Sequence, residues 1–183
     1  KCSQVQARTW VADPLRILNN LPINHVGCVG DISCFALVAG GTIVVMEQFD
    51  PSQILAVIER ERITAWGQVP AMFAMTLADE SFRAPARNLG PGPASTAELR
   101  DESKSRQDSS LALGMTRPSS NPPDLSSLQL IIWSGSAAPR ELVLQLKAIC
   151  PNLSSSYGLT ESVGSMTYAV GTEDLEILAD TIG

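Results

Sequence analysis

Short apolar runs alternate along the chain with longer segments that mix apolar and polar residues. The short runs predict strands at residues 16–18, 42–46, 63–66, 128–133 and 153–157. The longer segments predict helices at residues 26–39, 51–62, 70–77 and 140–149. Strands and helices that alternate in this way predict an α/β fold, in which a parallel sheet built from βαβ repeats is flanked by helices.

Local signals support several of these boundaries. Gly40-Gly41 is suited to end the helix at 26–39, because glycine readily takes the left-handed conformation found after a helix. Asp50 followed by Pro51 is typical of a helix start. The β-branched run at 42–46 predicts a strand covered on both faces. Gly158 is expected to turn the chain after the strand at 153–157.

Residues 80–123 have a different composition. They hold half of the 12 prolines, together with serines and charges of both signs. A compact domain seldom carries so long a loop without structure of its own. We therefore expect a mobile insertion within a single domain fragment that spans 1–183. The insertion is either solvated filler or a regulatory or partner-binding segment.

Composition and charge exclude several classes of protein. Hydrophobic residues make up 44% of the chain and charged residues 17%, which indicates a globular fold. The net charge of −6 argues against a nucleic-acid partner. The apolar stretch at 26–46 is interrupted by Asp31 and four glycines, so we expect no integral membrane segment. Four cysteines without a CxxC pair and one histidine argue against a zinc cluster and favour reduced thiols and a cytoplasmic location.

In a parallel sheet, ligands bind outside the carboxyl ends of the strands. The loops expected there lie at 22–27, 67–70, 134–139 and 157–162, and the first carries His25. The last contains the run Tyr157–Glu161, which offers an aromatic ring for a base, a hydroxyl for a phosphate and a carboxylate for a hard cation. The run suits a magnesium nucleotide, and it equally suits an ordinary β-turn.

The chain resembles the adenylate-forming superfamily of acyl- and aryl-CoA synthetases, luciferases and peptide-synthetase adenylation domains. The run Tyr157–Glu161 resembles the YGxTE motif of that family. Four further segments agree in order and spacing with motifs of its CoA-ligase branch: Leu21–His25 (LPxxH), Ala39–Thr42, Gly67–Pro70 (GxP), and Asp124–Leu128 with Ser134–Pro139. The resemblance covers nearly the whole chain except 80–123.

The resemblance implies an acid–thiol ligase. Such enzymes activate a carboxylic acid with ATP to an acyl-adenylate and then form a thioester with CoA, so ATP, Mg and CoA would be the cofactors. It implies that Thr160 and Glu161 are catalytic, with Glu161 as the Mg ligand. The cofactor-binding residues would be Gly135, Ser136, Ala137, Tyr157, Gly158 and Thr160. His25, Gly67 and Gly135 would bind the carboxylic acid.

The sequence departs from the family pattern in several places. The sequence lacks the glycine-rich phosphate loop, the ribose-binding aspartate and the catalytic lysine, so we expect a fragment of the large N-terminal domain that is inactive alone. Ala71 stands where the family has threonine, and Ser136 replaces a glycine. An alternative is a catalytically inactive nucleotide-binding or interaction module. An α/β hydrolase is disfavoured because the chain has no GxSxG motif.

Overall fold

The computed structural model describes residues 2–78, 122–169 and 174–181. Its centre is one sheet of six strands in the order β2-β1-β3-β4-β5-β6. The strands are β1 (Arg16–Asn19), β2 (Thr42–Val45), β3 (Ala65–Gln68), β4 (Leu130–Trp133), β5 (Leu153–Leu159) and β6 (Gly164–Ala169). The insertion expected at 80–123 falls almost entirely outside the described residues.

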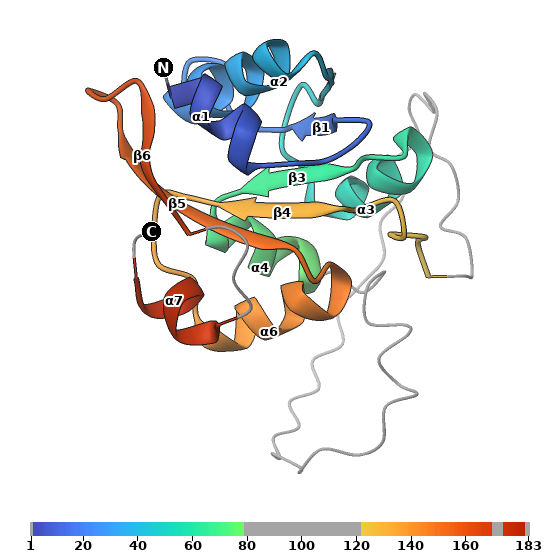
Figure 1. Ribbon diagram of the computed structural model, residues 1–183. Coiled ribbons are helices and arrows are strands. Elements are labelled where there is room, and N and C mark those ends of the chain that lie inside the picture. Colours follow the sequence, from blue (N-terminus) through green and yellow to red (C-terminus); the bar gives the residue numbers. More distant parts are fainter. Residues whose placement is uncertain (1, 79–121, 170–173, 182–183) are drawn as a thin grey trace, which may run out of the picture.

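Helices cover both faces of the sheet, which gives three layers (Figure 1). One face carries α1 (Cys2–Thr9), the π-helix η1 (Gly27–Ser33) and α2 (Cys34–Ala39). The opposite face carries α3 (Pro51–Glu61), α4 (Pro70–Ala78), α6 (Arg140–Ile149) and α7 (Leu175–Asp180). Each face has its own apolar core, with Phe35 at the centre of the first and Trp66 packed edge-on against Phe73 in the second.

The expected α/β class is confirmed, and so are two predicted helix boundaries. Gly40 ends α2 in the left-handed conformation, with φ of 71°. Asp50 begins α3, and its carboxylate accepts a hydrogen bond of 3.0 Å from the backbone N–H of Ser52. Hydrogen bonds from the side chains of Ser52 and Gln53 also hold the pKa of Asp50 below its ordinary value. The local sequence was sufficient here because both boundaries depend on a few neighbouring residues.

Four expectations need correction. The sheet is mixed, because β6 pairs antiparallel with β5. The strand β2 lies at the sheet edge with Val45 66% exposed, so it is not covered on both faces. The chain does not turn at Gly158: β5 continues through this residue, and the turn occupies 160–163. The helix at 26–39 is a π-helix followed by an α-helix, and α1, β6 and α7 were not predicted.

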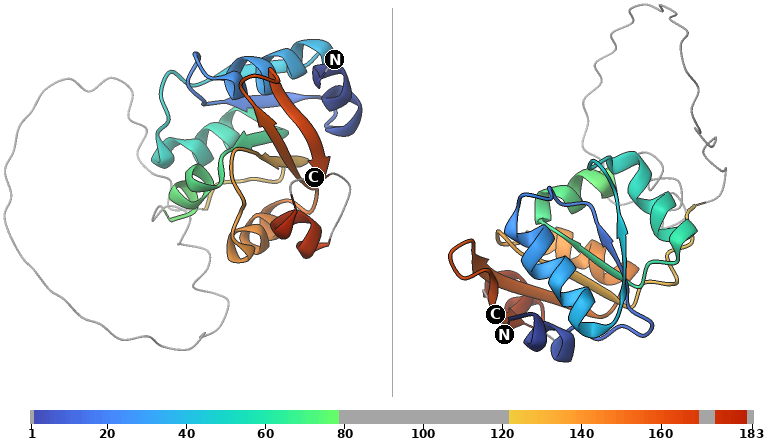
Figure 2. Two further views of the ribbon diagram at one scale, coloured as in Figure 1. Left: turned by 90° about the vertical axis from the view of Figure 1, so that its left-hand side faces the viewer. Right: turned by 90° about the horizontal axis from the view of Figure 1, so that it is seen from above.

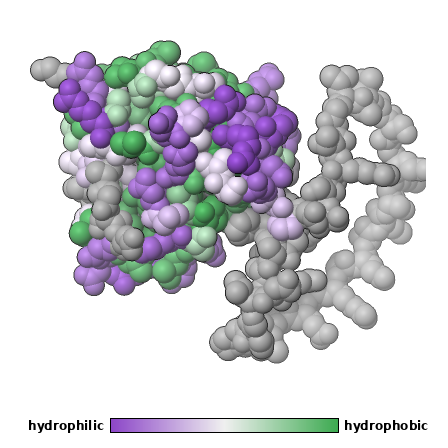
Figure 3. Space-filling view, turned by 45° about the vertical axis from the view of Figure 1, so that its right-hand side comes forward, coloured by the Kyte–Doolittle hydropathy of each residue, from purple (hydrophilic) through white to green (hydrophobic). Residues whose placement is uncertain are grey.

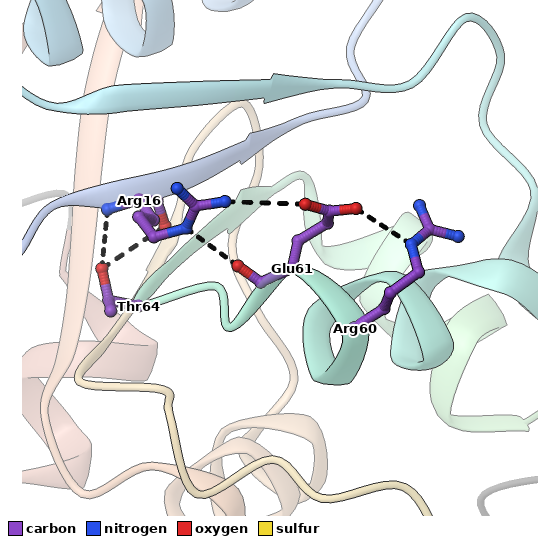
Figure 4. A network of polar contacts seen from close by, with 4 residues as sticks. All are labelled: Arg16, Arg60, Glu61 and Thr64. Carbon is purple, nitrogen blue, oxygen red and sulfur yellow. Dashed lines mark hydrogen bonds and ion pairs between the residues drawn. The ribbon is translucent and has the colours of Figure 1, made fainter.

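Polar contacts fix the amino-terminal edge of the sheet (Figure 4). The buried hydroxyl of Thr64 accepts from the backbone N–H of Arg16 at 2.8 Å, and Nε of Arg16 donates to the carbonyl of Glu61 at 2.8 Å. The carboxylate of Glu61 lies between the guanidinium groups of Arg16 and Arg60, at 3.5 and 2.9 Å. These contacts attach the end of α3 to the starts of β1 and β3.

The surface near this edge has no extended apolar face among the described residues. In Figure 3, which brings this side of the molecule forward, hydrophobic side chains are scattered among hydrophilic ones. The left view of Figure 2 faces the opposite edge, where β1, β3 and β4 end and the β5–β6 hairpin lies in the foreground. A ligand-binding site is expected at this carboxyl edge of the sheet.

Candidate active site

A cavity of about 460 Å³ lies at the carboxyl edge of the sheet. This volume is typical of sites for small molecules, which occupy about 300–1,000 Å³. Most of its wall is apolar and comes from both faces of the sheet: Trp10, Ile17, Leu21, Val26, Ile32, Val69, Met72 and Ile132. Such a wall suits an apolar ligand body, whereas the polar groups on it would set the orientation of the ligand.

Six of the residues expected at a site line this one cavity: His25, Gly67, Gly135, Gly158, Thr160 and Glu161. They come from four separate loops or strand ends, so the order of the parallel strands brings them together. Tyr157, Ser136 and Ala137 do not line it. Tyr157 is 37% exposed and the other two are also exposed, which places all three on the surface outside the cavity.

The loop before η1 holds His25 in a defined orientation. The Nδ1 atom of His25 accepts a hydrogen bond of 3.0 Å from the backbone N–H of Gly27. The backbone N–H of His25 donates to the carbonyl of Pro22, and its carbonyl accepts from Cys28. With Nδ1 used as an acceptor, the ring proton lies on Nε2, and this N–H remains available to donate to a ligand.

Gly67 and Gly135 leave space in the cavity wall. A Cβ atom at Gly67 would lie 3.6 Å from the side chain of Ile32, which is ordinary contact, so larger side chains there would extend into the cavity. Gly135 has φ of +90° and would bring a Cβ to 3.3 Å from Val69. That conformation strongly favours glycine, since other residues rarely adopt it.

The turn between β5 and β6 carries Thr160 and Glu161 in exposed positions. Its shape is held by the hydroxyl of Ser162, which accepts from the backbone N–H of Leu159 at 3.0 Å and donates to the carbonyl of Gly164 at 2.6 Å. A short turn closed by such a hydrogen bond presents its outer side chains without needing them for its own stability.

Gly158 has a structural role that the sequence did not reveal. A Cβ atom at this position would lie 2.2 Å from the carbonyl oxygen of Gly164 in β6, far inside contact distance. The pairing of β5 with β6 is irregular at this point, between Tyr157 and Gly158. Glycine is therefore required where the two strands approach, whatever contact the residue makes with a ligand.

Asp31 belongs to the site, although sequence reasoning had counted it only as a charge that interrupts an apolar stretch. It lines the cavity from η1. Its Oδ1 atom accepts from the backbone N–H of Ser165 at 2.8 Å and from the side chain of Gln6 at 2.7 Å. Asp31 thereby connects η1 to β6 and α1. The nearby Tyr168 has its pKa raised to about 12, first by burial and then by the charges of Cys2 and Asp31, so its hydroxyl stays protonated and donates to the carbonyl of Ser165.

Gln68 is a second residue that sequence reasoning missed. It is the last residue of β3, it lines the cavity and it is 2% exposed. Only its place in the segment Gly67–Pro70 could have drawn attention to it.

Across the part of the chain that the structure describes, no helix is both long enough and apolar enough to span a bilayer.

Comparisons with known proteins show two relatives among CoA-thioester-forming enzymes. A feruloyl-CoA synthase of Amycolatopsis sp is 32% identical over 82 residues, which cover 45% of this chain and 17% of the relative. The medium/long-chain-fatty-acid–CoA ligase FadD8 of Mycobacterium tuberculosis is 27% identical over 167 residues, which cover 90% of this chain and 22% of the relative. The chain thus spans about a fifth of the length of these relatives.

Solved structures show the same fold. The N-terminal domain of FACL13 from Mycobacterium tuberculosis superposes with a TM-score of 0.71 at 22% identity, over 99% of this chain and 36% of that one. A family model of AMP-binding enzymes matches residues 1–183. Because this match covers all 183 residues of the sequence, the chain belongs to the family of AMP-binding enzymes.

Proposed function

We propose that the protein containing this chain is an acid–thiol ligase. It would activate a carboxylic acid with ATP to an acyl-adenylate, release pyrophosphate and transfer the acyl group to CoA. The relatives that carry CoA ligase or CoA synthase in their names support this function. The observation that carries it is the single cavity in which the apolar wall meets His25, Thr160 and Glu161.

The arrangement suits an acid with an apolar body. The hydrocarbon part would lie against Ile32 and Ile132, with Gly67 keeping the passage open. The carboxylate would lie toward His25, whose Nε2–H can donate to one of its oxygens. Holding the carboxylate in one orientation favours its attack on the α-phosphorus of ATP, from which pyrophosphate leaves.

The nucleotide would lie on the surface next to the cavity. Tyr157 is exposed there, and its ring can stack on adenine. The exposed strip Gly135–Ala137 can approach the base closely because its side chains are small. Thr160, in the turn, can donate its hydroxyl to a phosphate oxygen.

The described residues fit Mg through one carboxylate. They hold no group of three or more histidine, cysteine, aspartate or glutamate side chains that could form a complete metal cage. Mg needs no such cage beside a nucleotide, because it keeps several waters and binds phosphates with one or two carboxylates. Glu161 lies exposed on the cavity wall and can supply that ligand. Bound Mg would offset the charge of the phosphates.

Acid-dependent exchange of pyrophosphate into ATP tests this proposal in the intact protein. Glu161→Gln keeps the size of the side chain and removes its charge. Loss of one preorganised charged contact typically costs about 3–4 kcal/mol, so the exchange rate should fall about a hundred- to a thousandfold. The melting temperature should change little, because Glu161 is exposed and makes no ion pair among the described residues.

Glu59→Gln is the matched control, since Glu59 is exposed on α3 and lies outside the cavity lining. This control should retain the wild-type rate. A Glu161→Gln protein with wild-type rate and wild-type Mg dependence would remove the metal-ligand role. An intact protein that binds ATP but exchanges no pyrophosphate with any acid would instead be an inactive nucleotide-binding module.

We also propose a cytoplasmic location for the ligase. All four cysteines are free: Cys2, Cys28, Cys34 and Cys150. Burial raises the pKa of the Cys150 thiol, which keeps it protonated and unreactive. Free thiols of this kind persist in a reducing compartment.

A further inference from the structure

The turn that carries Thr160 and Glu161 lies in a hairpin at the margin of the sheet. Its second strand, β6, comes last in the strand order and pairs with β5. The hairpin rises past the sheet next to α1 (Figure 1). Val163, which closes the turn, has φ of +60°, a conformation that β-branched residues rarely adopt. Backbone strain of this kind persists only where surrounding contacts hold it, so the contacts of this hairpin matter for the position of the turn.

Asp31 of η1 provides such a contact from outside the sheet. Its Oδ1 atom accepts a hydrogen bond of 2.8 Å from the backbone N–H of Ser165, two residues after Val163. The same oxygen accepts from the side-chain amide of Gln6 in α1 at 2.7 Å. Gln6 is 0% exposed and Ser165 is 1% exposed, so water competes little for these hydrogen bonds.

The backbone on both sides of this contact has the space that it needs. A Cβ atom at Gly30 would lie 2.8 Å from the carbonyl oxygen of Val163, and a Cβ atom at Gly164 would lie 2.8 Å from Oδ1 of Asp31. Glycine at these two positions therefore allows η1 to approach the hairpin closely. The distance between η1 and the turn is set by a backbone contact at Val163 and a hydrogen bond at Ser165.

The π-helix η1 is itself attached to the centre of the fold. The side-chain amide of Asn19, at the end of β1, donates to the hydroxyl of Ser33 at 3.0 Å and to the carbonyl of Cys28 at 3.3 Å. Asn19 is 2% exposed, so these hydrogen bonds are buried. The helix also follows directly on the loop of His25. One element thus joins the two sides of the cavity, with His25 before it and the turn of Glu161 held by its Asp31.

We propose that Asp31 is a positioning residue. By holding Ser165 to η1, it fixes the turn so that the carboxylate of Glu161 can bind Mg beside the phosphates of ATP. The inference rests on the proposed function, in which Glu161 is the Mg ligand. It adds a reason why an exposed carboxylate on a short turn can act as a preorganised ligand, since preorganisation requires that the turn has one position before Mg-ATP arrives.

The test uses the intact protein and substitutions that separate position from charge. Asp31→Ala removes the acceptor of both hydrogen bonds. Asp31→Asn removes the charge but keeps an oxygen that can accept from Ser165. Gly30→Ala leaves Asp31 in place and brings a Cβ against the carbonyl of Val163. Asp50→Ala is the matched control, because it also removes a carboxylate that accepts from a backbone N–H, but at the start of α3 and outside the cavity lining.

Three measurements are made on each variant. Hydrogen–deuterium exchange of the ligand-free protein follows the amide of Ser165 and its neighbours in the hairpin. Pyrophosphate exchange across a Mg titration gives the rate and the Mg concentration needed for half of that rate. Calorimetric titration with ATP and Mg gives binding without turnover.

We expect Asp31→Ala and Gly30→Ala to speed deuterium exchange in the hairpin and to raise the Mg requirement about tenfold. Their pyrophosphate-exchange rate should fall about a hundredfold, since a shift of about 1 Å in a positioned group can cost that much. Asp31→Asn should stay within about fivefold of the wild-type rate, because it keeps the hydrogen bonds in a weaker, uncharged form. Asp50→Ala should leave the Mg requirement unchanged.

Combining Asp31→Ala with Glu161→Gln shows whether Asp31 acts through Glu161. If it does, the double variant should exchange pyrophosphate within about fivefold of the rate of Glu161→Gln alone, because the position of an absent carboxylate no longer matters. If the two residues act independently, their losses multiply.

Multiplied losses would overturn the inference. So would an Asp31→Ala protein whose hairpin exchanges deuterium faster while its Mg requirement stays at the wild-type value, because Asp31 would then be a structural contact only. Equal loss in Asp31→Asn and Asp31→Ala would also overturn it, since charge and not position would be responsible. If Asp31→Ala does not fold, the Mg requirement of Gly30→Ala decides in the same way.

Failure of the ligase proposal gives a different result. A wild-type protein that binds ATP with Mg but exchanges no pyrophosphate with any acid would refute that proposal alone, and the calorimetric affinities of the variants for ATP and Mg would still decide the role of Asp31. A wild-type protein that binds no ATP with Mg would overturn both.

Discussion

Replacing Gly158 by alanine tests how closely the structure of the hairpin is tied to the site. The added Cβ would lie 2.2 Å from the carbonyl oxygen of Gly164, which is 1.2 Å less than the 3.4 Å at which ordinary contact begins. It would also lie 2.6 Å from the Cα of Ser165. All of these atoms belong to backbone, so no side chain can rotate away and β6 must move from β5.

The expected cost follows from this displacement. Overpacking of a close contact costs about 1–3 kcal/mol, and each ladder hydrogen bond lost adds about 1 kcal/mol. We therefore expect Gly158→Ala to lower the free energy of unfolding by about 3 kcal/mol. The turn at 160–163 moves with β6, and a shift of about 1 Å in a positioned group can cost roughly a hundredfold in rate.

Urea unfolding followed by circular dichroism measures the first effect, and pyrophosphate exchange in the intact protein measures the second. Gly67→Ala is the matched control, because its Cβ would meet Ile32 at an ordinary 3.6 Å, and its free energy of unfolding should stay within about 0.5 kcal/mol of wild type. A Gly158→Ala protein as stable as this control would show that the strands do not approach so closely. That result would refute the requirement for glycine at position 158.

Three further substitutions give independent tests. Gly67→Val should raise KM for the larger acids about tenfold in the thioester assay and leave small acids unaffected, because branches beyond the Cβ contact with Ile32 enter the cavity. Asp50→Ala should cost about 1 kcal/mol of folding free energy at pH 7 in urea unfolding, through loss of the helix cap. The pKa of Asp50 is lower in the folded protein than in the unfolded chain, so Asp50 stabilises the fold above the unfolded pKa of about 3.9. This stabilisation is lost as the pH falls through the folded pKa. The difference in free energy of unfolding between Asp50→Ala and wild type should therefore vanish in strong acid. Thr64→Val should destabilise by about 1–3 kcal/mol by leaving the backbone N–H of Arg16 without its acceptor, yet exchange activity should persist in the folded fraction.

The sequence predicts those parts of the fold that depend on neighbouring residues. The boundaries at Gly40 and Asp50 were correct because a cap is decided within one helical turn. The prediction that β2 is covered on both faces was wrong, because a β-branched run looks the same in the sequence of a central strand and of an edge strand. The order of strands in the sheet depends on pairings between distant segments. The strand β6 was missed because its sequence, GSMTYA, contains no continuous apolar run.

The residues of the candidate site likewise differ in whether the sequence alone could reveal them. His25, Gly67 and Glu161 could be found because they lie in loops that follow predicted strands, and a parallel sheet brings those loops together. Gln68 could not be found, since nothing in the local sequence tells whether an amide is buried or has a partner. The role of Asp31 likewise depends on its contact with Ser165, which is 134 residues away in the chain.

The π-helix η1 has a consequence for how the chain tolerates changes in length. A π-turn is equivalent to one residue inserted into an α-helix. Deleting Val29, which is half-exposed within η1, would allow the segment to wind as an ordinary α-helix. Because the π-turn accommodates the extra residue locally, the residues of α2 would keep nearly their present orientation after this deletion. A single-codon deletion here should therefore do less damage than one in the middle of α3 or α6, where every later residue would rotate by about 100° relative to the residues before it.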